Sequence, residues 1–283
     1  MTYANYLSET DQRQQANSIY ETALGIVSKE EGERSVAAAK MMGLMADNNY
    51  RIQAHSTEDY TVASEQAETA LQVIEEKLGK NNFLIAEPKN VKAKTYAIPD
   101  KEEKLKLLSD AEKLFTATVG NYNPGTAAIM TNMGITYKQT GRNSEAEELL
   151  TKSLAIKEKI LGEDESVALS HFHLFHFYFE NIEDYGKAEG YLLDYARIID
   201  QVHGPAYSAL GNSYDWLITL YQTTEEVDKE NEVQKKKDEW EKLQEKKDNE
   251  EEDNEMNKEE KQKEEITLEE LIKFVTVSDT IEP

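Results

Sequence analysis

Three histidines close together in the chain, His171, His173 and His176, are the first place to look for chemistry. Of these, His173 and His176 share a helix face because they are three residues apart. A protein zinc site needs three or four ligands, and neither a cysteine nor a carboxylate completes a tetrahedral set locally. We therefore predict no metal and no cofactor, and interpret the histidines as packing and binding-surface residues.

The residue patterns of common enzyme classes are missing from the sequence. Lys80 follows Gly79, but the upstream glycine and the following serine or threonine of a phosphate-binding loop are not there. No Gly-x-Ser-x-Gly, His-Glu-x-x-His or dinucleotide-binding glycine pattern occurs. The chain has no cysteine, which excludes disulfides, thiolate metal sites and cysteine nucleophiles. We predict that the protein is not an enzyme.

A handful of polar residues suits the binding of another polypeptide. Asn132 offers an amide that can hydrogen-bond a peptide backbone or a terminal carboxylate, and Lys138 adds a positive charge. Asp215 can pair with an arginine of the ligand. Together with His173 and His176 these residues form the predicted peptide-binding groove. The alternative is that they are solvated surface residues without a dedicated ligand.

A helical repeat is predicted to position these residues. Its clearest mark is a series of glycines spaced by 41, 42 and 42 residues: Gly79, Gly120, Gly162 and Gly204. Each ends a long helical pattern, where glycine closes a helix in a left-handed conformation without a steric penalty. Upstream of each glycine, small or apolar residues recur at i, i+4 and i+7, as in Ala146, Leu150 and Ser153. A partner helix precedes them, with Gly134 12 residues before Ala146.

This pattern is typical of tetratricopeptide repeats in their long form of about 42 residues, rather than of an ordinary helical bundle. It predicts an all-α protein, an α–α superhelix of about five helix pairs over residues 1–224, with the first and last pairs incomplete. We expect extra residues near Asp47–Asp59 to form a longer loop between helices. Pro88 is expected in the first turn of its helix, where its missing N–H is harmless.

The remainder of the chain is predicted to be a charged C-terminal tail. Residues 225–247 read as a charged helical extension, and residues 248–265 as an acidic low-complexity linker. Residues 266–283 form a short amphipathic segment with Leu268, Leu271 and Ile272 on one helical face. The two interpretations of this segment are docking on the chain's own superhelix, which we favour, and binding to a partner.

The charge of the chain limits its partners. The net charge is −24, with 56 acidic and 32 basic residues. Binding to nucleic acid needs clustered lysine and arginine, so we expect none, and a basic peptide is the better electrostatic match. No apolar run is long enough to span a membrane, and Met1–Ser8 has no secretory pattern. We therefore expect no membrane insertion and a location in the cytoplasm, the nucleus or both.

Several segments resemble the amyloid protein-binding protein 2 family. The resemblance is carried by the runs Ala146–Gly162 and Val167–Leu192, by Tyr207-Ser208 with Leu217-Ile218 and Leu220-Tyr221, and by Asn132 and Trp240; it extends from about Tyr3 to Lys247. The family has a long N-terminal region with an elongin-binding box, and this chain starts past it. Asp215 also stands where the family has an arginine.

The resemblance implies a substrate-recognition subunit of a cullin-2 RING ubiquitin ligase, which binds C-terminal degrons of the Arg-x-x-Gly kind for proteasomal degradation. The partners it implies are a polypeptide ligand with a C-terminal or basic segment and, where an N-terminal region exists, the cullin-2 ligase subunits. The alternative function is a microtubule or motor cargo adaptor resembling kinesin light chain, or one that binds the amyloid precursor protein tail. Both are protein-binding functions.

Overall fold

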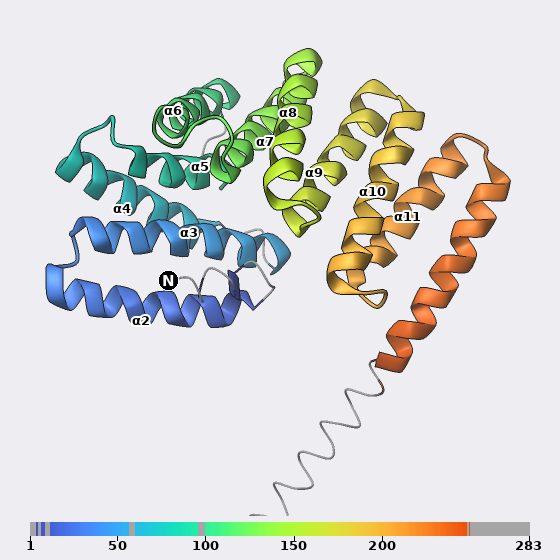
Figure 1. Cartoon of the computed structure of the whole chain (residues 1–283), viewed down its shortest axis with the longest axis horizontal. Helices are drawn as coiled ribbons and strands as arrows, with labels where there is room; N and C mark the ends of the chain where they lie inside the picture. The colour runs from blue at the N-terminus through green and yellow to red at the C-terminus, as the bar shows by residue number, and fades with distance from the viewer. Residues whose placement is uncertain are drawn as a thin grey trace, which may run out of the picture. The chain divides into compact units, whose positions relative to one another are not determined.

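The computed structural model describes residues 12–56, 60–95 and 100–247, together with Ala4, Leu7, Ser8 and Asn249. All regular structure in these residues is helical, which confirms the predicted all-α repeat fold (Figure 1). The helices are α2 (Arg13–Glu31), α3 (Val36–Ser56), α4 (Thr61–Leu78), η1 (Phe83–Ile85), α5 (Ala86–Lys94), α6 (Lys101–Val119), α7 (Pro124–Gln139), α8 (Asn143–Leu161), α9 (Glu165–His176), η2 (Phe177–Ile182), α10 (Tyr185–His203) and α11 (Ser208–Thr223). A last helix covers residues 227–247.

The chain divides into two compact units, residues 1–191 and residues 192–283, and each is described by itself. In the first unit, consecutive helices pack as neighbours: α2 on α3, α3 on α4, α5 on α6 and α7 on α8. In addition, α3 contacts α5 and α5 contacts α7. Every second helix therefore lies next to the one before it, which brings equivalent positions of successive repeats together.

The helix ends follow from local sequence. Asn123 precedes α7 and its Oδ1 accepts a hydrogen bond from the Gly125 N–H, while Pro124 occupies the first helical position. Asp164 caps α9 in the same way by accepting from the Ser166 N–H. The predicted glycines after α4, α6, α8 and α10 all have positive φ, between 68° and 84°. Gly32 after α2 has the same role, with φ of 96°.

The core of the first unit is built from the small residues that recur along the sequence. Ala63, Ala67 and Ala70 of α4 are fully buried, as is Ala146 of α8. Gly134 on α7 lies so close to α8 that a Cβ there would approach Leu150 Cγ to 2.8 Å. Small residues are needed at these positions because they allow neighbouring helices to approach closely. One position departs from this rule, since Lys104 is buried on α6 and burial lowers its pKa to about 8.

Two local predictions can be compared with the structure. The loop expected near Asp47–Asp59 is wrong for its first part, because α3 continues as a helix to Ser56. The extra residues therefore lengthen α3 and extend its inward-facing side. Pro88 lies in the first turn of α5, as predicted. Before α2, the described residues Ala4 and Leu7 are buried against Tyr20.

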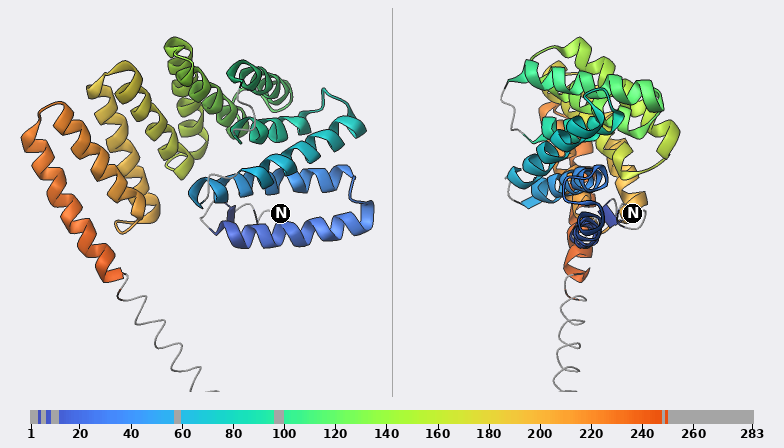
Figure 2. Two further views of the ribbon diagram at one scale, coloured as in Figure 1. Left: turned by 180° about the vertical axis from the view of Figure 1, so that it is seen from behind. Right: turned by 90° about the vertical axis from the view of Figure 1, so that its left-hand side faces the viewer.

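In the second unit, α11 is paired with the helix over residues 227–247 (Figure 2). The Trp240 indole N–H donates to the Tyr207 carbonyl at 3.2 Å, and the Gln244 amide donates to the Ala206 carbonyl. The stretch predicted as a charged extension thus packs as a second helix, although it has none of the small residues by which the other second helices were found. The predicted acidic linker and short amphipathic segment lie outside the described residues, apart from Asn249.

Candidate peptide-binding surface

The predicted binding residue Asn132 belongs to a row of asparagines on successive first helices. Its Nδ2 donates to Asn90 Oδ1 on α5 at 2.7 Å. Asn48 on α3 precedes Asn90 by the same 42 residues that separate Asn90 from Asn132. Asn48 and Asn90 are buried and Asn132 is half-buried. Sequence reasoning identified only Asn132, although counting back by the repeat length finds the other two.

His173 on α9 occupies the position equivalent to Asn132 in the next repeat. Its ring is half-buried and, among the described residues, makes no hydrogen bond or ion pair within contact distance. Burial, together with the positive charges of Lys157 and Lys138 and the neighbouring His176, lowers the pKa of His173 to about 3. The imidazole is therefore neutral at neutral pH, with one donor and one acceptor nitrogen.

Lys138 and His176 are joined by a carboxylate that sequence reasoning missed. Glu180 Oε2 accepts from Lys138 Nζ at 2.8 Å, and Glu180 Oε1 lies 2.6 Å from His176 Nδ1. Burial opposes ionisation, but the bonds from Lys138 and His176 lower the pKa of Glu180 overall. Glu180 sits on the π-helical turn η2, a rare feature that re-aims side chains within a helix. Its position 42 residues after Lys138 is the signal that could have revealed it.

Asp215 lies in the second unit, on α11, whereas the other four predicted residues belong to the first. Its carboxylate pairs with Lys237 of the 227–247 helix at 2.7 Å. The side chain of Asp215 is 58% exposed, so this pair contributes little to stability. Asp215 therefore already has a partner of the sign expected for a ligand.

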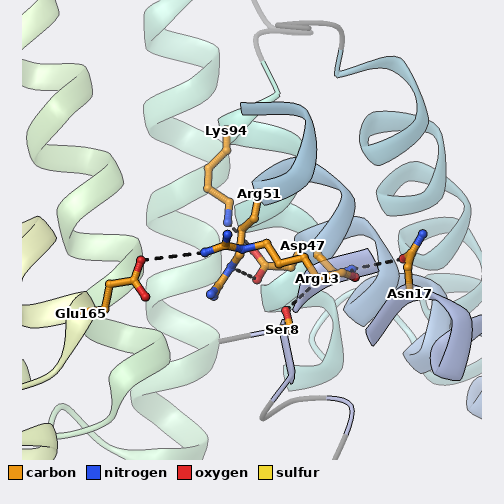
Figure 3. A network of polar contacts seen from close by, with 8 residues as sticks. Ser8, Arg13, Asn17, Asp47, Arg51, Lys94 and Glu165 are labelled. Atoms are coloured by element: carbon orange, nitrogen blue, oxygen red, sulfur yellow. Dashed lines mark hydrogen bonds and ion pairs between the residues drawn. The ribbon is translucent and has the colours of Figure 1, made fainter. Parts of the chain in front are cut away.

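A second polar cluster, not predicted from the sequence, lies on α2, α3, α5 and α9 (Figure 3). Asp47 accepts from Arg51 Nε at 3.0 Å and from Lys94 Nζ. Burial opposes ionisation, but these two cations hold the pKa of Asp47 well below its usual range. At the start of α2, Arg13 Nη2 lies 3.8 Å from Glu165 Oε1 at the start of α9. This contact links residues 152 positions apart in the chain.

Neither cluster has the arrangement of a catalytic or metal centre. The three histidines diverge, since His171 Nε2 faces Glu158 at 3.5 Å while His176 faces Glu180. In the part of the chain that the structure describes, no three histidine or carboxylate side chains converge on a common point. None of the described helices has a stretch long and apolar enough to cross a membrane. What the surface offers is hydrogen-bonding and charged groups on neighbouring helices.

A tetratricopeptide-repeat family model matches residues 102–159, which extend from the first turn of α6 to near the end of α8. No curated protein matches the chain. The repeat part of the expected resemblance is thus supported, and the amyloid protein-binding protein 2 family itself stays a proposal. Tetratricopeptide-repeat folds are protein-interaction scaffolds and are generally not enzymes.

Solved structures of repeat proteins share the fold. BtubC (BKLC) from P. vanneervenii aligns with a TM-score of 0.62 and 16% identity, over 82% of this chain and 91% of that one. A variant of a presumed kinesin light chain from Podosopora anserina, with nearly identical TPR-like repeats, aligns with a TM-score of 0.56 and 19% identity, over 75% and 98%. A Rap protein complexed with Competence and Sporulation Factor aligns with a TM-score of 0.54 and 16% identity, over 86% and 74%. At these identities the likeness concerns the fold.

Proposed function

We propose that the chain is a non-catalytic scaffold that binds an extended polypeptide across α7 and α9. The observation that carries this proposal is the placement of Asn132 and His173 at equivalent positions of successive first helices, both half-buried. Asn132 uses its amide nitrogen on Asn90, and among the described residues its Oδ1 accepts no hydrogen bond. Asn132 therefore offers an acceptor and His173 both an acceptor and a donor to a peptide backbone.

The spacing of the helices suits a peptide in extended conformation. Packed helices lie about 8–10 Å apart, and an extended chain advances about 3.3 Å per residue. A peptide that crosses successive first helices thus meets an equivalent side chain about every three residues. Lys138, at the end of α7, adds a positive charge that can leave Glu180 for a ligand carboxylate.

For the role of this binding we propose substrate recognition for a cullin-2 RING ubiquitin ligase, with C-terminal degrons of the Arg-x-x-Gly kind as ligands. The resemblance of the repeat segments to the amyloid protein-binding protein 2 family supports it. The net charge of −24 favours the arginine of such a ligand, and Asn132 with Lys138 suits its terminal carboxylate. The ligase role places the protein in the cytoplasm, the nucleus or both.

Binding of fluorescent peptides that end in Arg-x-x-Gly tests the proposal. Amidated peptides and Arg→Ala peptides serve as controls for the carboxylate and the arginine. We expect selective binding that is lost on amidation and that weakens about tenfold in an Asn132→Ala variant. Binding that is equal across the panel, or indifferent to Asn132, would contradict a degron-binding site at this position.

A cargo or cytoskeletal adaptor is the second candidate, because the chain shares its fold with a presumed kinesin light chain over 98% of that chain. This function predicts co-sedimentation with microtubules or co-purification with a motor heavy chain. A degron receptor does neither and instead binds elongin and cullin subunits through a further N-terminal region. Measuring both sets of partners with the same tagged protein separates the two roles.

A further inference from the structure

The second polar cluster unites four cations from four helices of the first unit: Arg13 of α2, Arg51 of α3, Lys94 of α5 and Lys157 of α8. Arg51 and Lys94 share Asp47. The Arg13 carbonyl accepts a hydrogen bond at 2.9 Å from Asn48, the residue next to Asp47. Lys157 Nζ donates to Ser170 Oγ at 2.8 Å and to the Ser166 carbonyl, one residue after Glu165.

The carboxylates of this region differ in how firmly they are held. Asp47 lies within hydrogen-bond distance of two cations and has only 18% of its side chain exposed. Asp164 is committed to the cap of α9. Glu87 has a raised pKa because it is buried and lies close to the negative charge of Asp47. Glu165, in contrast, approaches Arg13 only to 3.8 Å, beyond hydrogen-bond distance.

Lys157 shows that positive charge is not fully compensated here. No carboxylate among the described residues forms an ion pair with it, and its two bonds go to neutral oxygens. Burial, opposed by Asp164 and reinforced by the charge of Arg51, lowers the pKa of Lys157 to about 8. In a chain of net charge −24, a region with this balance is the local exception and attracts anions against the overall field.

We infer that Arg13, with Arg51 and Lys157 nearby, forms a carboxylate subsite for the polypeptide ligand, and that Glu165 occupies it until a ligand carboxylate replaces it. The exchange keeps the charge of the region constant, so no buried charge is left uncompensated. Arginine is suited to it, because its planar guanidinium binds carboxylates through two parallel hydrogen bonds, a geometry that the 3.8 Å contact with Glu165 does not reach.

This inference rests on the proposed function and adds two features to it. The ligand carries an acidic group in the part that reaches the start of α9, away from the groups that meet Asn132 and His173. The Arg13–Glu165 pair also joins the first and the fourth helix pairs, which in a repeat array contact only their neighbours. Ligand binding therefore opens this link between distant repeats.

The test uses a fluorescein-labelled, amidated peptide that carries three glutamates separated by glycines, and its glutamine counterpart. Fluorescence anisotropy at low ionic strength compares the wild-type chain with Glu165→Gln and Arg13→Gln. We expect Glu165→Gln to bind the glutamate peptide about threefold more tightly, as the loss of a weak competing ion pair requires. We expect Arg13→Gln to weaken binding about tenfold or more, with partial recovery in Arg13→Lys.

Arg34 and Glu76 provide matched controls, because they form an exposed ion pair at 2.7 Å elsewhere in the same unit. Arg34→Gln and Glu76→Gln make the same charge changes and are expected to leave binding unchanged. Circular dichroism and thermal unfolding show whether each variant is folded, and Glu165→Gln, which gains affinity, cannot do so by unfolding.

Failure of this inference is distinguishable from failure of the proposed function. If Glu165→Gln does not bind the glutamate peptide more tightly than its glutamine counterpart, the carboxylate subsite is overturned. In that case Asn132-dependent binding of the Arg-x-x-Gly peptides still supports the proposed function. If the glutamate peptide behaves as expected but no peptide responds to Asn132, the subsite stands and the proposed backbone contact fails.

Discussion

The side-chain amide of Asn132 donates to the carboxamide oxygen of Asn90 at 2.7 Å, and the two residues occupy the same position of consecutive repeats. This bond links α7 to α5 and fixes which face of the Asn132 amide points outward. It thereby couples the stability of the repeat array to the geometry of the proposed binding surface.

Replacing Asn90 by alanine should therefore destabilise the first unit and weaken peptide binding together. Asn90 is buried, so its loss leaves the Asn132 amide without its partner, at a cost of about 1–2 kcal/mol in the free energy of unfolding. Urea unfolding followed by circular dichroism measures the loss. Gln72→Ala, which removes an exposed amide bonded to Glu68, is the control and should change stability by less than about 0.5 kcal/mol. An Asn90→Ala variant as stable as this control would contradict the structural role.

His173 should make the protein less stable in mild acid. Its pKa is about 3 in the folded chain and 6.5 in the ordinary state, so the unfolded chain binds more protons between these values. Stability is thus unaffected above pH 6.5 and falls as the pH drops below it. Between about pH 6.5 and about pH 5 the loss due to this residue is about 2 kcal/mol.

Urea unfolding of wild type and His173→Gln over this pH range measures the effect. The glutamine cannot be protonated, so the pH dependence should shrink by about this amount while stability at neutral pH changes less. His176 also has a lowered pKa because of burial, opposed by Glu180, so a double substitution should flatten the profile further. The same pH profile in His173→Gln as in the wild type would show that the imidazole is not kept neutral.

The repeat itself could be predicted because its physical causes are local. A glycine with positive φ is needed where a helix closes, and small residues are needed where two helices touch, so both leave a mark at fixed spacing. Asn132 could be predicted from its place on the first helix, and Asn90 and Glu180 lie one repeat away from residues already identified.

Two features could not be predicted in this way. The Arg13–Glu165 contact depends on how four successive helix pairs stack, and no local pattern specifies that. The 227–247 helix was not recognised as a second helix because the usual order is reversed. Here the small residue, Gly211, is on the first helix and the large one, Trp240, on the second.

Asp47 should be among the most costly single positions of the first unit. Asp47→Asn removes the charge that holds Arg51 and Lys94 and leaves two cations facing each other with little solvent. We expect a loss of about 3 kcal/mol in the free energy of unfolding. Glu76→Gln, which breaks an exposed pair, should lose less than about 1 kcal/mol. Because the pKa of Asp47 is lowered, its contribution should persist at neutral pH and disappear as the pH falls below 3.8.

The contact between Gly211 and Trp240 gives the second unit a test of its own. A Cβ on Gly211 would lie 2.4 Å from Trp240 Cη2, so Gly211→Ala must displace the indole and its hydrogen bond to Tyr207. Overpacking of this kind costs about 1–3 kcal/mol. Gly25→Ala is the matched control, since no atom lies within 4 Å of the added Cβ and alanine favours the helix by about 1 kcal/mol. Limited proteolysis of the 227–247 helix, with unfolding by urea, measures both variants. In the Trp240→Ala background the ring is gone, so the further change Gly211→Ala should cost nothing; an equal cost in both backgrounds would show that the indole does not lie on Gly211.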